Sequence, residues 1–228
     1  MMVEGDTELQ GAAADDPYDA IVLAGGRGSR LGLVDKATLD VGDGPLLAGV
    51  LEAVAAARHV VVVGPPRDLP AHIHQVREEP VFGGPAAAVV TGLHALPTES
   101  GADGAAPWTI VLGCDLPLAR QAVPLLLATR RGEGCVLADG EGHAQWVAGV
   151  YSTSALVAAA ESLGDATDRP LRALLGRLST RALAAPGRVG DDVDTWDQVS
   201  EWNDYFIDGE DADESSADDE PEERSANE

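Results

Sequence analysis

The 228-residue sequence predicts an α/β fold in which a doubly wound, mostly parallel sheet lies between two layers of helices. Short apolar runs of strand length alternate along the chain with longer segments whose apolar residues recur at helical spacing. The runs 59–64 and 108–114 are apolar almost throughout, as expected of parallel strands that helices cover on both faces. We therefore predict a three-layer α/β/α, Rossmann-like architecture with its ligand site at the carboxyl ends of the strands.

The elements follow one another in the order that a doubly wound sheet requires. A strand that begins at Ile21 runs into a glycine-rich loop, and apolar residues at helical spacing come next. The run that follows ends at Gly64-Pro-Pro, a boundary typical of a buried strand. By the same criteria we expect further strands at 59–64, 72–77, 108–114, 134–138, 146–151 and 181–184, and helices at 46–57, 85–96, 121–131, 154–163, 170–178 and 195–206.

The formal net charge of −24 is concentrated in the two ends of the chain. Residues 1–16 hold five acidic and no basic residues, and residues 208–228 hold eleven acidic residues and one arginine. Segments this polar cannot bury enough apolar surface to offset their ordering entropy, so we predict disordered acidic termini at 1–16 and 208–228 around one domain at 17–207. Nucleic acid is not an expected partner, because its binding rests on clustered basic residues.

The sequence also indicates where the protein resides. Its apolar runs are shorter than the ~20 residues of a membrane span, and its acidic N-terminus lacks the basic and apolar regions of a secretory signal. Cys114 and Cys135 fall in expected interior strands and indicate neither a disulfide framework nor a zinc site. We therefore expect a soluble, cytoplasmic protein that does not bind membranes.

The most informative stretch is Ile21-Val-Leu-Ala-Gly-Gly-Arg-Gly-Ser-Arg-Leu-Gly-Leu-Val-Asp-Lys36. A strand that runs into glycines lets backbone N–H groups approach an anion, because glycine has no Cβ to block the approach. Arg30 and Lys36, the only lysine in the chain, add positive charge at the same place. These residues predict a loop that binds a polyphosphate.

Two common phosphate-binding loops do not fit this stretch. A Walker A loop needs Ser or Thr after its lysine, where Ala37 stands, and the third glycine of a Rossmann fingerprint falls on Leu31. The pattern that fits is L-A-G-G-x3-R-x-G-x2-D-K, formed by Leu23, Ala24, Gly25, Gly26, Arg30, Gly32, Asp35 and Lys36. In this pattern the chain resembles the MobA-type nucleotidyltransferases, which join GMP to molybdopterin.

The resemblance extends over residues 18–206 and is strongest at 21–36 and 111–117. It implies the nucleotide-diphospho-sugar transferase type of fold and the Mg²⁺-dependent transfer of GMP from GTP to (molybdenum-)molybdopterin, with release of pyrophosphate. It also implies that Lys36 and Arg30 are catalytic. The nucleotide-binding residues that it implies are Leu23, Ala24, Gly25, Gly26, Lys36, Glu78 and Asp115.

Asp115 and Asp194 are the candidate Mg²⁺ ligands. Asp115 directly follows the expected strand 108–114, where ligands bind, and Mg²⁺ prefers one or two carboxylates together with phosphate oxygens. The alternative role of each is helix capping, which Thr195 offers as well at the last helix. Cys114-Asp-Leu-Pro117 resembles the family's metal-binding segment and Asp192-Val-Asp-Thr195 its late N-x-N-T or D-x-D-T segment, which favours the ligand role.

The choice of nucleotide is inferred from Gly25 and Glu78. The L-A-G-G form resembles guanylyltransferases, whereas cytidylyl relatives tend to carry L-A-A-G. Glu78 stands where the family often has an aspartate that contacts the guanine nucleotide, and a solvated surface pair with Glu79 is the alternative.

On the acceptor side, 143–151 resembles the segment that faces the pterin, so Gln145 and Trp146 are candidates to hydrogen-bond to a flat heterocycle or to stack on it. Arg172, together with Arg169, is a candidate for the acceptor's phosphate. The alternatives are a core position for Trp146 and an ordinary surface position for the arginines.

Two other functions fit the same residues. A sibling transferase would use another acceptor, such as a sugar phosphate or phospholactate, or would use CTP with molybdopterin. A non-catalytic nucleotide-binding protein on the same fold is the other alternative, although it has no need to keep Arg30, Lys36 and Asp115 together. The expected partners are GTP, a molybdopterin-type acceptor and, transiently, molybdoenzymes or cofactor-insertion proteins.

Overall fold

The computed structural model describes residues 16–26, 31–32, 34–97, 104–139 and 142–217. Their main feature is a seven-stranded sheet in the order β5-β4-β1-β6-β8-β7-β9. All neighbouring strands in it are parallel except β8, which runs antiparallel to β6 and β7. The strands are β1 (Tyr18–Leu23), β4 (Val60–Val63), β5 (Ile73–Val76), β6 (Trp108–Gly113), β7 (Gly134–Ala138), β8 (Ala144–Ser152) and β9 (Arg181–Ala184).

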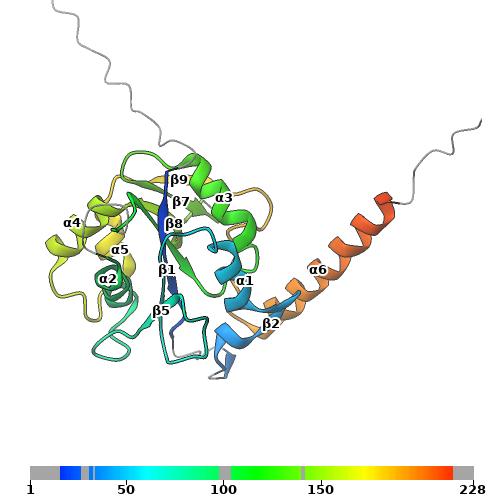
Figure 1. Cartoon of the computed structure of the whole chain (residues 1–228). Coiled ribbons are helices and arrows are strands. Elements are labelled where there is room, and N and C mark those ends of the chain that lie inside the picture. The colour runs from blue at the N-terminus through cyan, green and yellow to red at the C-terminus, as the bar shows by residue number, and fades with distance from the viewer. Residues whose placement is uncertain (1–15, 27–30, 33, 98–103, 140–141, 218–228) are drawn as a thin grey trace, which may run out of the picture.

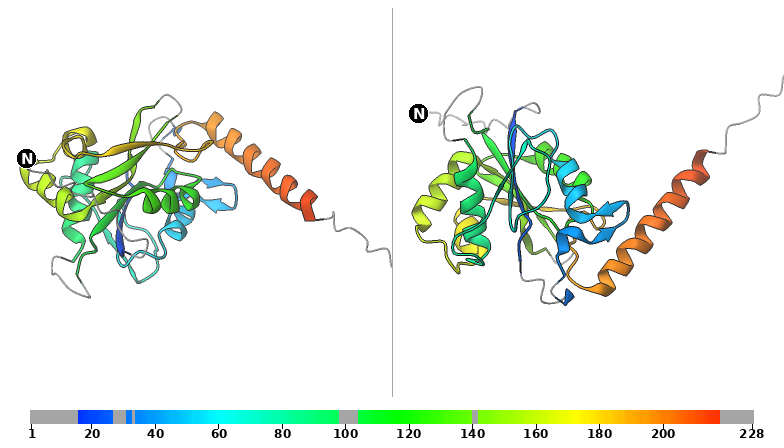
Figure 2. Two further views of the ribbon diagram at one scale, coloured as in Figure 1. Left: turned by 90° about the horizontal axis from the view of Figure 1, so that it is seen from above. Right: turned by 60° about the horizontal axis from the view of Figure 1, so that its bottom comes forward.

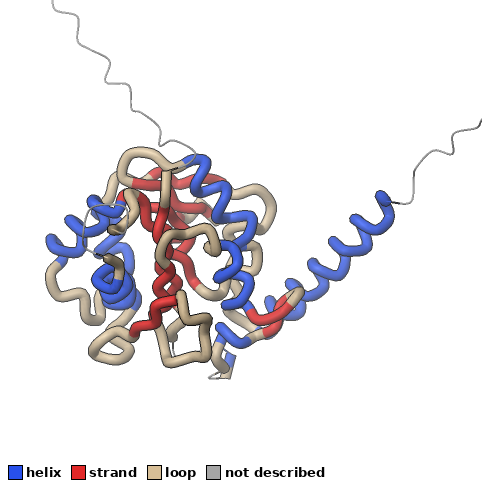
Figure 3. Tube along the Cα trace, in the orientation of Figure 1, coloured by secondary structure: helices blue, strands red, loops and turns tan. Residues whose placement is uncertain are grey.

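Helices cover both faces of this sheet, so the predicted three-layer α/β/α fold is confirmed (Figures 1 and 3). Alternate residues of β1 enter two separate cores: Ala20 and Val22 pack into one, and Ile21 packs into the other. The first core is closed by α1 (Leu46–Ala53), α3 (Ala119–Thr129) and α6 (Trp196–Ala217). The second is closed by α2 (Pro85–Ala95), α4 (Thr153–Leu163), α5 (Leu171–Leu174) and the 3₁₀ helix η3 (Leu175–Arg177).

The order of the strands reverses beside β1, because β4 and β5 lie on one side of it and β6 on the other. A crevice at the carboxyl ends of the strands forms at such a reversal and is the usual ligand site of this class of sheet. Here the backbone ties the strand ends together: Cys114 N donates to Leu23 O at 3.0 Å, and Ala24 N donates to Val63 O at 2.9 Å. The loops after β1 and β6 therefore meet, as predicted.

Several elements differ from the sequence-based prediction. β1 begins at Tyr18 instead of Ile21, and the helix expected over 170–178 is divided into α5 and η3. Three short elements that follow the glycine-rich loop were not expected: the 3₁₀ helix η2 (Lys36–Thr38) and a hairpin of β2 (Asp40–Val41) and β3 (Gly44–Pro45). Elements of two or three residues are too short to leave a periodic pattern in the sequence.

The last helix, α6, is longer than predicted. The sequence predicts a helix that ends near residue 206 and an acidic tail from 208, whereas α6 continues to Ala217 and projects from the body of the molecule (Figures 1 and 2). Once a helix has nucleated, each further residue adds a hydrogen bond at little cost, so it can extend beyond its packed part. The first turns of α6 are anchored by the buried side chains of Val199 and Trp202. The Arg188 guanidinium packs on the Trp202 ring, 3.9 Å from its centroid.

The rest of the predicted acidic termini, residues 1–15 and 218–228, lies outside the described residues. In the part of the chain that the structure describes, every helix is too short or too polar to cross a membrane.

Candidate functional site

The glycine-rich loop starts in a closely packed arrangement at the end of β1. A Cβ on Gly64 would lie 2.5 Å from Ala24 O, so only glycine allows the end of β4 to approach the loop this closely. Gly26 has a φ of +149°, which also favours glycine. The predicted catalytic residue Arg30 lies outside the described residues, so its place in the site stays a prediction.

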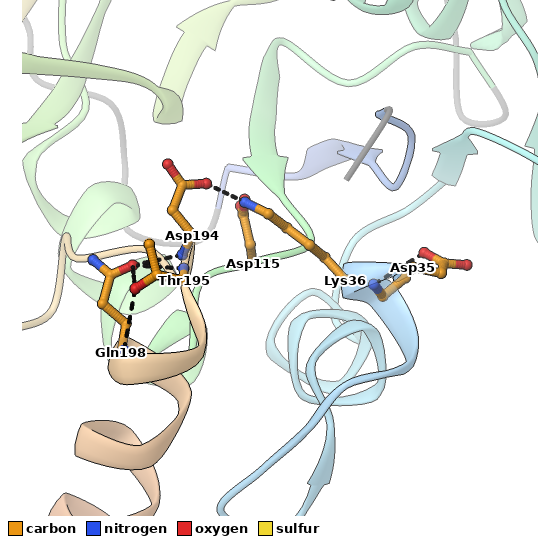
Figure 4. Close-up of polar contacts among 7 residues, drawn as sticks. Asp35, Lys36, Asp115, Asp194, Thr195 and Gln198 are labelled. Carbon is orange, nitrogen blue, oxygen red and sulfur yellow. Dashed lines mark hydrogen bonds and ion pairs between the residues drawn. The ribbon is translucent and has the colours of Figure 1, made fainter. Parts of the chain in front are cut away.

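Beyond the loop, Lys36 lies between two carboxylates that come from distant parts of the chain (Figure 4). Its Nζ donates to Asp115 Oδ2 at 2.9 Å and to Asp194 Oδ1. The three side chains are only 20–30% exposed. Burial by itself would lower the pKa of Lys36, but the charges and hydrogen bonds of Asp115 and Asp194 outweigh it and raise this pKa above its usual range. Lys36 therefore remains a cation in the site.

The structure excludes the capping alternative for the two aspartates, whereas their role as metal ligands stays a prediction. Thr195 caps α6: Gln198 N donates to Thr195 Oγ1 at 3.3 Å, and Thr195 N donates to Gln198 Oε1 at 3.0 Å. The Asp194 carboxylate points instead toward Lys36 (Figure 4). Leu118 occupies the N-cap of α3, so Asp115 does not cap that helix.

A third carboxylate, that of Asp192, completes an acidic cluster that the sequence analysis had not selected as a ligand set. One carboxylate oxygen each from Asp115, Asp192 and Asp194 lies within 4.8 Å of the others. Burial, followed by the charges of Asp115 and Asp194, raises the pKa of Asp192. The signal in the sequence was the spacing Asp192-Val-Asp194, because alternate residues of an extended segment share a face.

These three carboxylates fit a divalent cation. Hard cations such as Mg²⁺ take oxygen ligands, and the cluster brings three carboxylates together beside the single ammonium of Lys36. The cluster is also held in place by the backbone, because Val193 N donates to Asp115 O at 3.0 Å. Asp115, Asp192 and Asp194 are accordingly the candidate metal ligands among the described residues.

A pocket of about 280 Å³ opens beside the start of the loop. Leu23, Gly25 and Gly26 line it together with Glu78, so four of the predicted nucleotide-binding residues share one cavity. The Glu78 carboxylate is held there by its own loop, because Phe82 N donates to Glu78 Oε1 at 3.1 Å. Glu79 is exposed, whereas Glu78 is half-buried at the pocket, so the two residues differ in position, and a role for Glu78 in binding the nucleotide stays a prediction.

Arg67, in the segment between β4 and β5, is a residue that the sequence analysis missed. Its guanidinium donates to Ala24 O at 2.7 Å and to both carboxylate oxygens of Asp35. Asp35 in turn caps η2, the helix that begins with Lys36, by accepting from Ala37 N at 3.2 Å. Arg67 lies far from the loop in the sequence, so no local pattern could have identified this contact.

The predicted acceptor residues are more dispersed. Gln145 and Trp146 lie at the start of β8, which the antiparallel direction of that strand places beside the carboxyl ends of its neighbours. Gln145 Nε2 donates to Asp139 Oδ2 at 3.1 Å, and Trp146 is packed against the core. Arg172 is exposed on α5. An acceptor-binding role for these residues stays a prediction.

The chain is similar to proteins of a known family. A family model described as the MobA-like NTP transferase domain matches residues 20–182. The chain is 30% identical over 133 residues to a molybdenum cofactor guanylyltransferase of Pseudomonas putida GB-1, a match that covers 55% of this chain and 65% of the relative. The chain is also 34% identical over 107 residues to a molybdenum cofactor guanylyltransferase of Pseudomonas putida KT2440. That match covers 45% of this chain and 52% of the relative. The matches thus span between about half and two thirds of the length of these relatives.

Solved structures share the fold. The molybdopterin-guanine dinucleotide biosynthesis protein A of Archaeoglobus fulgidus gives a TM-score of 0.60 at 16% identity, covering 84% of this chain and 100% of the other. The 2-C-methyl-D-erythritol 4-phosphate cytidylyltransferase of Thermus thermophilus gives a TM-score of 0.58 at 18% sequence identity, and the match covers 82% of this chain and 98% of the other. At these identities the likeness establishes the fold alone.

Proposed function

The chain belongs to the family of MobA-like NTP transferase domains, and from this premise we propose that it transfers GMP from GTP to a molybdopterin-type acceptor with release of pyrophosphate. The observation that carries the proposal is the convergence of Lys36, Asp115 and Asp194 beside the loop that follows β1. A cation and two carboxylates at the switch point of the sheet are what a nucleoside triphosphate and its metal require.

The acidic cluster supports Mg²⁺ as the cofactor. Asp115, Asp192 and Asp194 would hold the ion through carboxylate oxygens, and other coordination positions would be left for phosphate oxygens and water. The chemistry that Mg²⁺ supplies when bound is neutralisation of charge on the triphosphate as the α-phosphorus is attacked.

The protein's own residues would act by positioning and by charge. An oxygen of the acceptor's phosphate attacks the α-phosphorus in line, a new P–O bond forms, and the bond to the β-phosphate oxygen breaks to release pyrophosphate. Lys36, and Arg30 in the loop, would stabilise the charge that develops on the transferring and leaving groups. No general base is required, because a phosphate monoester is already largely ionised near neutral pH.

The pocket of Leu23, Gly25, Gly26 and Glu78 supports guanine as the base. Gly25 and Gly26 line the pocket without side chains, which would leave room for a flat ring, and a carboxylate can accept from the N1–H and the 2-amino group that guanine carries. Adenine and cytosine lack this adjacent pair of donors. Glu78 is therefore proposed as the residue that selects the nucleotide.

The acceptor side of the proposal rests on Gln145, Trp146 and Arg172. They would bind the pterin ring and its phosphate, and transient contact with molybdoenzymes or cofactor-insertion proteins would deliver the product. A cytoplasmic location is proposed on the same basis, because it is where these partners would be met.

The test is an assay of pyrophosphate release with Mg²⁺, molybdenum-loaded molybdopterin and each of the four NTPs in turn. Asp115→Asn serves as the inactive control, and Arg120→Ala as a matched surface control, because Arg120 is exposed and pairs with Glu52. Release with GTP alone, abolished by Asp115→Asn and unchanged by Arg120→Ala, is the expected result. Release with another base would overturn the guanine assignment, and absence of release from folded, nucleotide-binding protein would overturn the acceptor.

A further inference from the structure

Arg67 makes contacts that join the two ends of the glycine-rich loop. One terminal nitrogen donates to Ala24 O, just after β1, at 2.7 Å and to Asp35 Oδ1 at 3.0 Å. The other terminal nitrogen donates to Asp35 Oδ2, directly before Lys36. The Arg67 side chain is 11% exposed and that of Asp35 is 44% exposed, so the guanidinium is largely removed from water although the carboxylate is not.

The backbone of Arg67 is fixed as firmly as its side chain. The Gln75 side chain, from β5, accepts from Arg67 N at 2.7 Å and donates to Arg67 O at 3.0 Å. This pair of hydrogen bonds satisfies both backbone groups of a residue that lies outside any strand. A rigid sheet strand therefore sets the position from which the guanidinium reaches the loop.

The guanidinium directs its terminal nitrogens, but not its Nε, to hydrogen-bond partners at the loop. Arg67 Nε is buried and has no hydrogen-bond partner among the described residues, an arrangement that costs free energy. The two terminal nitrogens are nevertheless placed on Asp35 and on the Ala24 carbonyl. Only the planar fork of arginine offers such a set of directed donors, so lysine is not an equivalent residue here.

The positive charge of Arg67 also offsets the negative charge of Asp35. Asp35 is an acidic residue next to Lys36, in a loop that would receive a triphosphate, and an uncompensated carboxylate there would repel the phosphates. The bidentate pair with Arg67 neutralises Asp35 and holds it where it caps η2, the helix that begins with Lys36.

We propose that Arg67 is a positioning residue for nucleotide transfer: by joining Ala24 to Asp35 it holds the two ends of the glycine-rich loop, and with them Lys36, in the arrangement that accepts the metal–nucleotide. This inference rests on the proposed function. Because Arg67 acts through the loop, its loss lowers the fraction of molecules in the accepting arrangement, and the apparent Kd for Mg·GTP rises by the inverse of that fraction. Among the described residues, the Arg67 guanidinium donates to Asp35 and Ala24 and not to Asp115, Asp192 or Asp194. Metal binding to these three carboxylates is therefore preserved when Arg67 is replaced.

The test compares Arg67→Lys, Arg67→Ala, Asp35→Asn and the double variant Arg67→Ala/Asp35→Asn with the wild type. Three quantities are measured for each: the Kd for Mg·GTP by calorimetry, the Kd for Mn²⁺ without nucleotide by electron paramagnetic resonance, and the thermal unfolding midpoint. Arg120→Ala is the matched control, because it removes an arginine–carboxylate pair at an exposed position.

We expect Arg67→Lys and Arg67→Ala to raise the Kd for Mg·GTP by about tenfold or more, with no rise in the Kd for Mn²⁺ and with Arg120→Ala like the wild type. The double variant should be no weaker than Arg67→Ala alone, because both substitutions break one linkage. Wild-type nucleotide affinity in both Arg67 variants would overturn the inference. It would also be overturned if nucleotide affinity, Mn²⁺ affinity and the unfolding midpoint all fell together, as a purely structural role requires.

These affinities, together with the pyrophosphate assay described above, separate this inference from the proposed function. A wild-type protein that binds Mg·GTP but transfers nothing to molybdopterin would overturn the proposed acceptor, while the role of Arg67 would still be decided by the affinities. A wild-type protein that binds no Mg·nucleotide would overturn both.

Discussion

Lys36 Nζ lies 2.9 Å from Asp115 Oδ2, although 79 positions separate the two residues in the sequence. The contact is possible because β1 and β6 are adjacent parallel strands, so that the loops leaving their carboxyl ends occupy the same crevice. The ammonium also pairs with Asp194, and it thereby offsets part of the charge of the acidic cluster. In the free protein Lys36 thus has a second role, as counter-ion to the carboxylates that would hold a metal.

Replacing Lys36 by Met should therefore have two effects. Turnover should fall by about 10²-fold or more, as when a transition-state charge loses a preorganised partner. In the free protein, Mn²⁺ affinity should rise, because the carboxylates no longer have the ammonium as a competing cation. Steady-state kinetics and a Mn²⁺ titration check these two results. Unchanged turnover, or weaker Mn²⁺ binding in a folded variant, would contradict this assignment.

Asp192 and Asp191 offer a matched pair for testing the metal site. Asp192→Asn should weaken Mn²⁺ binding by about tenfold, or about 1.4 kcal/mol, because affinity for a hard cation depends on the number of carboxylate ligands. Asp191→Asn should leave the affinity unchanged, since Asp191 faces Arg188, with Oδ2 3.4 Å from its Nε. The two Kd values are measured under identical conditions without nucleotide. Equal effects of the two substitutions would remove Asp192 from the ligand set.

The raised pKa of Asp192 predicts a pH dependence of stability. Between the ordinary aspartate pKa of about 3.9 and the raised pKa of the folded state, the folded protein binds a proton that the unfolded chain has released. The free energy of unfolding contributed by this group therefore falls as pH rises through that window. At pH 7 in EDTA, Asp192→Asn should be more stable than the wild type towards urea, and the difference should shrink as pH is lowered towards 4. A less stable variant at pH 7 would contradict the sign.

The sequence was sufficient for the features that local patterns encode. The apolar runs predicted the strands and hence the α/β/α sheet, and the glycine-rich loop with Lys36 and the position of Asp115 after β6 predicted one crevice. The capping alternatives at Asp115 and Asp194 stayed open, because the side-chain direction at a helix start depends on which neighbour takes the cap. Thr195 and Gln198 decide that at α6.

Features that depend on distant contacts were beyond the sequence. Arg67 stands in an ordinary Pro-Pro-Arg-Asp segment, and its contact with Asp35 appears only in the folded chain. The antiparallel direction of β8 is likewise set by its partners, β6 and β7, because an apolar run does not encode strand direction. The length of α6 was missed since its acidic residues suggested disorder, whereas propagation of an anchored helix is inexpensive.

Glu78 and Glu79 provide a matched pair for nucleotide selection. Glu78→Gln replaces one acceptor of the carboxylate by a donor, so it should raise KM for GTP by about tenfold and reduce the preference for GTP over ATP. Glu79→Gln should have little effect, because Glu79 is exposed and does not line the pocket with Leu23 and Gly25. The preference is measured as the ratio of kcat/KM for the two nucleotides. An unchanged ratio in Glu78→Gln would assign selection to the backbone of the loop instead.

Gly64 tests how strictly the start of the loop is positioned. A Cβ at this position would lie 2.5 Å from Ala24 O and 2.7 Å from Ala24 C, and these backbone atoms cannot move without shifting the loop. Gly64→Ala should therefore lower the free energy of unfolding by about 1–3 kcal/mol and weaken Mg·GTP binding. Gly49→Ala in α1 is the control: its Cβ meets no atom within 4 Å, and removal of a glycine from a helix should add about 0.5–1 kcal/mol. Urea unfolding measures both, and a Gly64→Ala protein as stable as the wild type would show that the loop can adjust to the added methyl group.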